Sequence, residues 1–152
     1  MHKMWLTGFA VAVGLAGWPN LAVADLFSVK RPVIAILADE LFVGEAEGHV
    51  SGEGTLAIHA QKNPRITCRG QFTAGADRSG SGEMNCSDGA TATFSFKRLS
   101  NYTGYGVGNF SRGSMSFAYG LTVQEVGPYL TLPQGKKLAH NGTGLELSDL
   151  KE

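Results

Sequence analysis

Apolar and polar residues alternate along most of the chain between Gly52 and Gly120. A period of two places successive side chains on opposite faces of a strand, which is typical of an antiparallel sheet with one wet face. The pattern predicts six strands, at 52–60, 65–73, 80–86, 90–97, 104–111 and 114–120. The loops between them are short, which favours a meander in which neighbours pair in order.

Two further strands are expected before this region. The run Val33–Ala38 is apolar and of strand length, and 41–50 is a second candidate. Residues 25–32 carry no strong pattern, so we expect a loose arm there.

The turn at 87–89 determines the register of the central hairpin. A three-residue loop with Gly89 in the left-handed conformation sets Gly82 opposite Phe94. A two-residue turn would place the phenylalanines opposite polar residues instead. Because a one-residue slip exchanges the two faces, the apolar pattern selects the three-residue loop.

The same rule predicts a row of residues across six strands in which glycine and phenylalanine alternate. A two-residue turn at Arg112–Gly113 places Gly108 opposite Phe117. The complete row is Gly54, Phe72, Gly82, Phe94, Gly108 and Phe117. A ring can cover the bare backbone of the facing glycine, and glycine permits the bend that a strand needs at a barrel corner. The predicted fold class is therefore all-β, a small antiparallel meander curled into a barrel or a strongly bent sheet.

The other face of these strands is polar. It carries Thr67, Arg69, Gln71, Glu83, Asn85, Thr91, Thr93, Ser95 and Lys97. A strand of an outer-membrane barrel needs roughly 9 to 11 residues and an apolar outer face. The predicted strands are shorter and their outer face is polar, so we expect no membrane span in the mature chain.

The pattern changes beyond the last predicted strand. Thr122 and Glu125 have the spacing of a capping box, and Pro128 limits the length of the element that they begin, so one short helix is expected near 122–127. Asn141–Gly142 indicates a final hairpin.

The first 24 residues have the features of a signal peptide. Lys3 gives a positive start, an apolar run occupies 5–17, and Ala22-Val23-Ala24 fits the small-residue cleavage rule. We expect cleavage after Ala24, which leaves a single β-rich domain at 25–152 in the periplasm.

The charge balance bears on possible partners. Lys3 is the only charged residue of the predicted signal peptide, so the mature chain keeps 12 basic and 13 acidic side chains. Without a basic surplus, neither nucleic acid nor an anionic membrane surface is an expected partner. The 21 glycines are spread through the strands rather than collected in a linker. Such glycine-rich strands indicate turns, bulges and close packing.

Cys68 and Cys86 are the two cysteines of the chain. They are symmetric about residue 77, the centre of the loop between their strands, so the register sets them opposite one another on the inner face. In an oxidising compartment this predicts a disulfide, worth on the order of 3 kcal/mol. A redox-active pair or a metal site is not expected, because the chain lacks a C-x-x-C motif and further ligands close in sequence.

The aromatic residues of the inner face leave two interpretations open. Phe72, Phe94, Phe96 and Phe110 either fill the core or line a cavity for an apolar ligand. The pairing of rings with glycines favours a filled core, because it uses the available space. The ligand-binding interpretation stays as the alternative.

No catalytic constellation is present in the sequence. Glu45, Glu47 and His49 alternate and would share one strand face, near His59, but this spacing is also that of a wet outer face. An enzyme would need these residues and Asp39 to converge in one cleft. We therefore predict no catalytic residue, no metal and no cofactor.

Two segments, together with the signal peptide, resemble small exported proteins of Gram-negative bacteria to which no activity is assigned. The segments are LADELFVGEAEG at 37–48 and GSGEMNCSDG at 80–89. The resemblance covers most of the mature chain. It implies the periplasm and no catalytic residues.

The sequence supports three functional hypotheses, in order of preference. The first is a non-enzymatic periplasmic domain that binds a protein partner or an envelope component, or serves envelope integrity. The second is a carrier of a small apolar ligand inside a β-barrel. The third is a small periplasmic enzyme.

Overall fold

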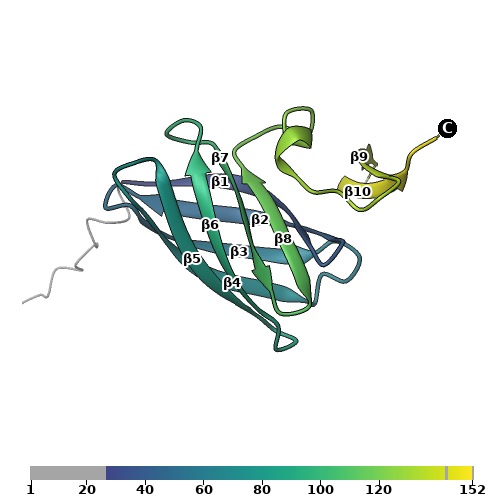
Figure 1. The fold of residues 1–152 in the computed structure, drawn as a ribbon, viewed down its shortest axis with the longest axis horizontal. Coiled ribbons are helices and arrows are strands. Elements are labelled where there is room, and N and C mark those ends of the chain that lie inside the picture. Colours follow the sequence, from purple (N-terminus) through teal and green to yellow (C-terminus); the bar gives the residue numbers. More distant parts are fainter. Residues whose placement is uncertain (1–26, 143, 152) are drawn as a thin grey trace, which may run out of the picture.

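The computed structural model describes residues 27–142 and 144–151. Eight antiparallel strands form a closed barrel in which neighbours in sequence pair and β1 closes on β8 (Figure 1). The strands are β1 (Ser28–Leu37), β2 (Glu40–His49), β3 (Glu53–Ala60), β4 (Thr67–Ala74), β5 (Ser79–Cys86), β6 (Thr91–Arg98), β7 (Gly104–Phe110) and β8 (Gly113–Tyr119). The predicted all-β meander is confirmed, and it is a barrel. The predicted signal peptide at 1–24 lies outside the described residues.

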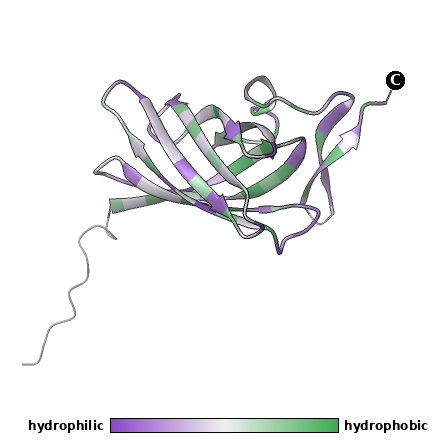
Figure 2. Cartoon of the chain, turned by 60° about the horizontal axis from the view of Figure 1, so that its bottom comes forward, coloured by the Kyte–Doolittle hydropathy of each residue, from purple (hydrophilic) through white to green (hydrophobic). Residues whose placement is uncertain are grey.

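Side chains of the barrel strands alternate between the interior and the exterior. In β6, Ala92, Phe94 and Phe96 are buried and the residues between them are exposed. Every polar residue expected on the outer face is exposed. Figure 2 shows the alternation as hydrophobic and hydrophilic bands along the strands. The two predicted faces are therefore confirmed.

The row of alternating glycine and phenylalanine is confirmed across five strands. Gly54 pairs with Phe72, Phe72 with Gly82, Gly82 with Phe94, and Phe94 with Gly108. A Cβ on Gly54 would lie 2.2 Å from Cζ of Phe72. The same close approach occurs in four more pairs, Phe94 on Gly82, Phe96 on Gly80, Phe117 on Gly106 and Tyr119 on Gly104. Only glycine leaves room for a ring at this distance.

The turn between β7 and β8 corrects one predicted register. The two-residue turn is Ser111–Arg112, one residue before the predicted Arg112–Gly113. Phe117 therefore pairs with Gly106 and not with Gly108. Moving a turn by one residue shifts the pairing by two and keeps every side chain on its face. The apolar pattern could not distinguish the two registers for that reason.

The start of β1 corrects a second expectation. The loose arm expected at 25–32 is wrong from Ser28 onward, because β1 pairs there with the end of β2. In this part of β1 the inner face carries Arg31 as well as Val29. A charged residue in an inward position removed the apolar signal that would have identified the strand.

The C-terminal region contains the predicted hairpin and a short helical turn, which begins only at the end of the range expected for it, 122–127. A hydrogen-bonded turn at 123–125 leads into a single 3-10 turn at Gly127–Tyr129. Half of the capping box forms, since the main-chain N–H of Thr122 donates to Oε2 of Glu125 at 3.2 Å. The hairpin consists of β9 (Lys136–Asn141) and β10 (Gly144–Asp149).

This C-terminal segment covers one side of the barrel. Ile34 and Ile36 face outward from β1 and are buried in a second apolar cluster with Val126. The main-chain N–H of Thr131 donates to Oγ of Ser116 on β8 at 2.9 Å, which fastens the segment to the barrel. The second half of β1, residues 33–37, is buried on both faces, and its sequence is accordingly a continuous apolar run.

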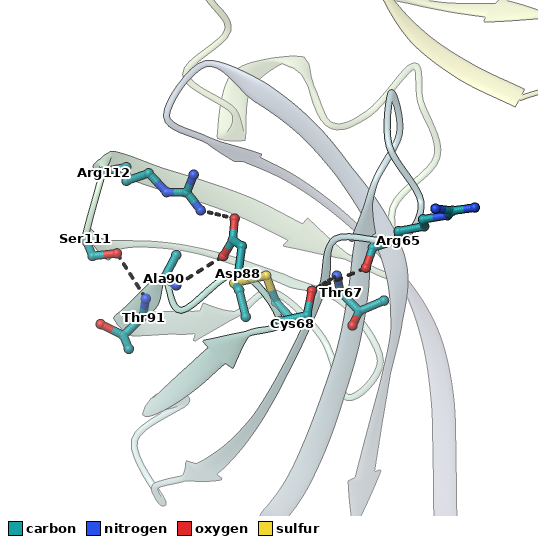
Figure 3. Close-up of polar contacts among 10 residues, drawn as sticks. Arg65, Thr67, Cys68, Asp88, Ala90, Thr91, Ser111 and Arg112 are labelled. Atoms are coloured by element: carbon teal, nitrogen blue, oxygen red, sulfur yellow. Dashed lines mark hydrogen bonds and ion pairs between the residues drawn. A yellow bond between two sulfur atoms is a disulfide. The ribbon is translucent and has the colours of Figure 1, made fainter.

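One end of the barrel, which we call the closed end, contains the predicted disulfide between Cys68 and Cys86 (Figure 3). The two residues are direct partners in the β4–β5 ladder. The interior beside them is filled by Leu37, Phe42, Met84, Ala92 and Phe110. Apolar packing and a covalent link together hold this end of the barrel.

The turn between β5 and β6 adds polar contacts at the closed end (Figure 3). Gly89 has φ +90°, as the predicted three-residue loop requires. The carboxylate of Asp88 accepts a hydrogen bond from the N–H of Ala90 at 3.1 Å and forms an ion pair with Arg112. The hydrogen bond from Arg112 holds the pKa of Asp88 below its ordinary value of 3.8.

Gly54→Ala is expected to lower the free energy of unfolding by about 1–3 kcal/mol, because the new methyl group overpacks the wall. It would lie 2.2 Å from Cζ of Phe72 and 2.4 Å from the carbonyl oxygen of Glu47. Gly48→Ala is the matched control: Gly48 is the ladder partner of Gly54, and its Cβ would meet only Cζ of Phe72, at 4.0 Å. Urea unfolding measures both variants, and equal losses would contradict the proposed role of the ring contacts.

Replacing Cys68 and Cys86 together by alanine is expected to lower the free energy of unfolding by about 3 kcal/mol. The disulfide closes a loop of sequence separation 18, and opening it releases chain entropy in the unfolded state. Urea unfolding with and without reductant tests this. Reductant should shift the wild-type curve toward the double variant, and an unshifted wild-type curve would refute the stabilising role.

Candidate functional site

The barrel is hollow at the end opposite the closed end. We call this end the mouth; it comprises the start of β1, the β2–β3 loop and the β6–β7 loop. A cavity of about 470 Å³ opens there. Its apolar lining includes Val33, Ile58, Phe72, Phe94, Phe96 and Phe117. The volume and the largely apolar lining are typical of small-molecule binding sites.

The ring contacts with glycine explain why space remains inside the barrel. A ring that lies over a bare glycine backbone is held along the wall. The rings also hold one another: Phe72 and Phe96 meet edge to face with centroids 5.6 Å apart, and Phe96 meets Tyr119 in the same way at 6.1 Å. The result is a rigid aromatic lining around an open centre.

The structure brings together three of the four phenylalanines proposed for ligand binding. Phe72, Phe94 and Phe96 line the cavity. Phe110 lies in the filled core of the closed end, 8% exposed, and is not part of the lining. The two interpretations of the aromatic residues therefore apply to different halves of the barrel: a filled core at the closed end and a cavity at the mouth.

Two arginines and no carboxylate line the cavity in the part of the chain that the structure describes. The guanidinium of Arg31 lies over the ring of Tyr102, with Cζ 4.6 Å from the ring centroid, and its Nη1 donates to the carbonyl oxygen of Lys30 at 3.1 Å. Arg98 stands at the end of β6, and its Nη2 donates to the carbonyl oxygen of Gly75 at 3.3 Å. The cavity is positive near its opening.

Two polar atoms at this site are buried without a hydrogen-bond partner among the described residues. They are Nε of Arg98 and Nδ1 of His49. Tyr119 also lines the cavity; burial raises the pKa of its hydroxyl above the ordinary 10.0, and the charge of Arg98 lowers the pKa by a smaller amount. The tyrosine hydroxyl therefore keeps its proton at neutral pH and can donate a hydrogen bond.

These polar residues were not predicted from the sequence, although a signal for them exists. Arg98 continues the inward series of Phe94 and Phe96 at the same spacing of two, and Arg31 precedes Val33 in the same way. At both arginines an inward position is polar, so the alternation of apolar and polar residues does not include them. A period of two nevertheless places side chains by position alone, whatever their polarity.

The residues considered for catalysis or metal binding do not converge. Asp39 lies in the β1–β2 turn at the closed end, and Glu45 and Glu47 face outward from β2 and line a polar depression on the outer surface of the barrel. His59 lies on β3 between the inward-facing Ile58 and Ala60, and His49 is at the mouth. Among the residues that the structure describes, no group of three or more His, Cys, Asp or Glu side chains could hold a metal ion.

Comparison with protein-family models, with curated proteins and with solved structures finds no match. Within 27–142 and 144–151, no helix is long and apolar enough to cross a membrane. The cavity is therefore the feature from which a function can be inferred.

Phe110→Ala is expected to lower the free energy of unfolding by about 3–5 kcal/mol, because it opens a void in a filled core. Phe72→Ala should cost about half as much, since this ring is only partly buried and borders open space, where fewer contacts can be lost. Urea unfolding of both variants measures the difference. If Phe72→Ala cost as much as Phe110→Ala, the division of the barrel into a filled and a hollow half would be wrong.

Proposed function

We propose that this protein is a non-enzymatic binding protein that carries a small, largely apolar ligand inside the barrel. The observation that carries the proposal is the cavity of about 470 Å³, open at the mouth and lined by aromatic and aliphatic side chains. Transfer of an apolar molecule from water into such a lining is favourable in proportion to the apolar area that leaves water.

The rigidity of the cavity wall supports the proposal. The rings of Phe94 and Phe96 lie over Gly82 and Gly80, and Phe94 also meets Phe117 edge to face at 5.3 Å. Side chains held in this way lose little conformational freedom when a ligand binds. A preformed site therefore spends less of its interaction energy on ordering.

We further propose that the protein acts in the periplasm after cleavage behind Ala24. The signal-peptide pattern supports export, and a disulfide persists in an oxidising compartment. Binding of a protein partner or an envelope component stays a prediction. The ligand carrier is preferred over it because a cavity is a specific feature of this barrel.

Binding of N-phenyl-1-naphthylamine, an uncharged apolar dye, tests the proposal. The mature protein should bind the dye at one site with increased fluorescence. Ala46→Trp, which places an indole in the cavity lining, should weaken binding at least about tenfold by occupying the ligand volume. Ala57→Trp is the matched control, because Ala57 is exposed on the outer face of the neighbouring strand.

The two variants must first show cooperative unfolding close to that of the wild type. Absence of dye binding by the wild type would refute the proposal. Equal affinity of Ala46→Trp and the wild type would place the dye outside the cavity and would refute it as well.

A further inference from the structure

The mouth of the barrel carries more positive charge than a purely apolar ligand requires. Arg31 and Arg98 both line the cavity, and no acidic residue of the described chain lines it with them. The carboxylate of Asp77 is near enough for the charge of Arg98 to act on its pKa, but that is the smallest contribution. Oδ1 of Asp77 accepts hydrogen bonds from the N–H and Oγ of Ser79, at 3.2 and 2.6 Å. Asp77 is thus engaged outside the cavity.

Arg98 and Tyr119 belong to one row of the barrel and are separated only by a glycine. Arg98 pairs with Gly104, and Gly104 pairs with Tyr119. A Cβ on Gly104 would lie 2.3 Å from the hydroxyl oxygen of Tyr119, so this hydroxyl lies directly over the glycine. The row therefore presents a guanidinium and a neutral hydroxyl donor to the same part of the cavity.

Arg31 adds a second guanidinium in the adjoining part of the wall. Tyr119 pairs with Val33, and Arg31 is the next inward residue of β1 toward the mouth. Cζ of its guanidinium lies 4.6 Å from the centroid of the Tyr102 ring, and Nη1 donates one hydrogen bond to the carbonyl oxygen of Lys30. A guanidinium has five N–H donors, so the others can bind an acceptor. Planar guanidinium groups bind carboxylate and phosphate oxygens in pairs of parallel hydrogen bonds.

The cavity is also polar at one end only. Ile58, Phe94 and Met115 line its inner part, whereas both arginines stand near the mouth. A ligand that matches this arrangement has an apolar tail and a negative head. An acceptor at the mouth would also satisfy the buried Nε of Arg98, which otherwise has no partner among the described residues.

We infer that Arg98, Tyr119 and Arg31 bind the anionic head group of an amphipathic ligand whose apolar tail occupies the barrel cavity. The inference rests on the proposed ligand-binding function and names the class of ligand. Carboxylate and phosphate heads share the required chemistry, because both present acceptor oxygens with negative charge to the two guanidinium groups.

A pair of fluorescent probes tests the charge requirement on the full mature chain. 11-(Dansylamino)undecanoic acid has a carboxylate head, and its methyl ester has the same tail without the charge. The wild type should bind the acid about tenfold or more tightly than the ester, since hydrogen bonds to charged groups carry this much free energy. Arg98→Met and Arg31→Met should each reduce the preference for the acid over the ester to about threefold or less.

Lys97→Met is the matched control for Arg98→Met. Lys97 is the neighbouring residue on β6 and is exposed on the outer face, so the variant removes the same charge from the opposite side of the strand. It should keep the full preference for the acid. Retention of the preference by both arginine variants, or its loss in Lys97→Met, would overturn the head-group assignment.

The outcomes separate the two proposals. Failure of both probes to bind would contradict ligand binding itself, whereas equal binding of acid and ester would leave the carrier intact and overturn the anionic head. Competition with dodecanoate and dodecyl phosphate then distinguishes the source of the head group. Displacement of the acid probe by either supports the inference, with the stronger competitor identifying the head, and displacement by neither refutes it.

Discussion

The contact between an aromatic ring and a bare glycine backbone is the constraint on which this barrel depends. Each of the five ring–glycine pairs, of which Phe72 on Gly54 is the closest, puts a large side chain where no Cβ could stand. The ring covers peptide groups that would otherwise be solvated, and the glycine lets the strand bend. Because the rings lie along the wall, the strands can close into a barrel without filling its centre.

Stability and the candidate site occupy opposite ends of the barrel. The closed end has the disulfide, a filled core around Met84 and Phe110, and the ion pair between Asp88 and Arg112. The mouth has an open cavity and therefore buries less apolar surface. Part of that deficit is offset outside the barrel, where the C-terminal segment buries Ile34 against Val126. The interior is free to remain hollow because apolar burial is supplied elsewhere.

The alternation of apolar and polar residues predicted most of the fold and part of the candidate site. The period of two determined the faces, and Gly89 with the apolar pattern determined the hairpin and the pairing of the cysteines. The pattern could not determine the register of β8 against β7. A shift of the pairing by two residues keeps every side chain on its face, so the ladder partner of Phe117 could not be predicted. The cavity was one of two alternatives that the sequence left open, because the choice between a ring on the wall and a ring at the centre depends on closure of the whole sheet.

The two arginines of the mouth stand where the inward series of apolar residues breaks. An unpaired guanidinium nitrogen in a buried position costs stability, and an arginine can reach water from an outward position at no such cost. Lys97, one residue before Arg98, occupies an outward position of that kind. In the rest of the barrel the inward positions carry apolar residues or glycine. A departure from this pattern that costs stability is expected at functional sites. The inward position of Arg98, with its buried unpaired Nε, therefore supports the proposed anionic ligand.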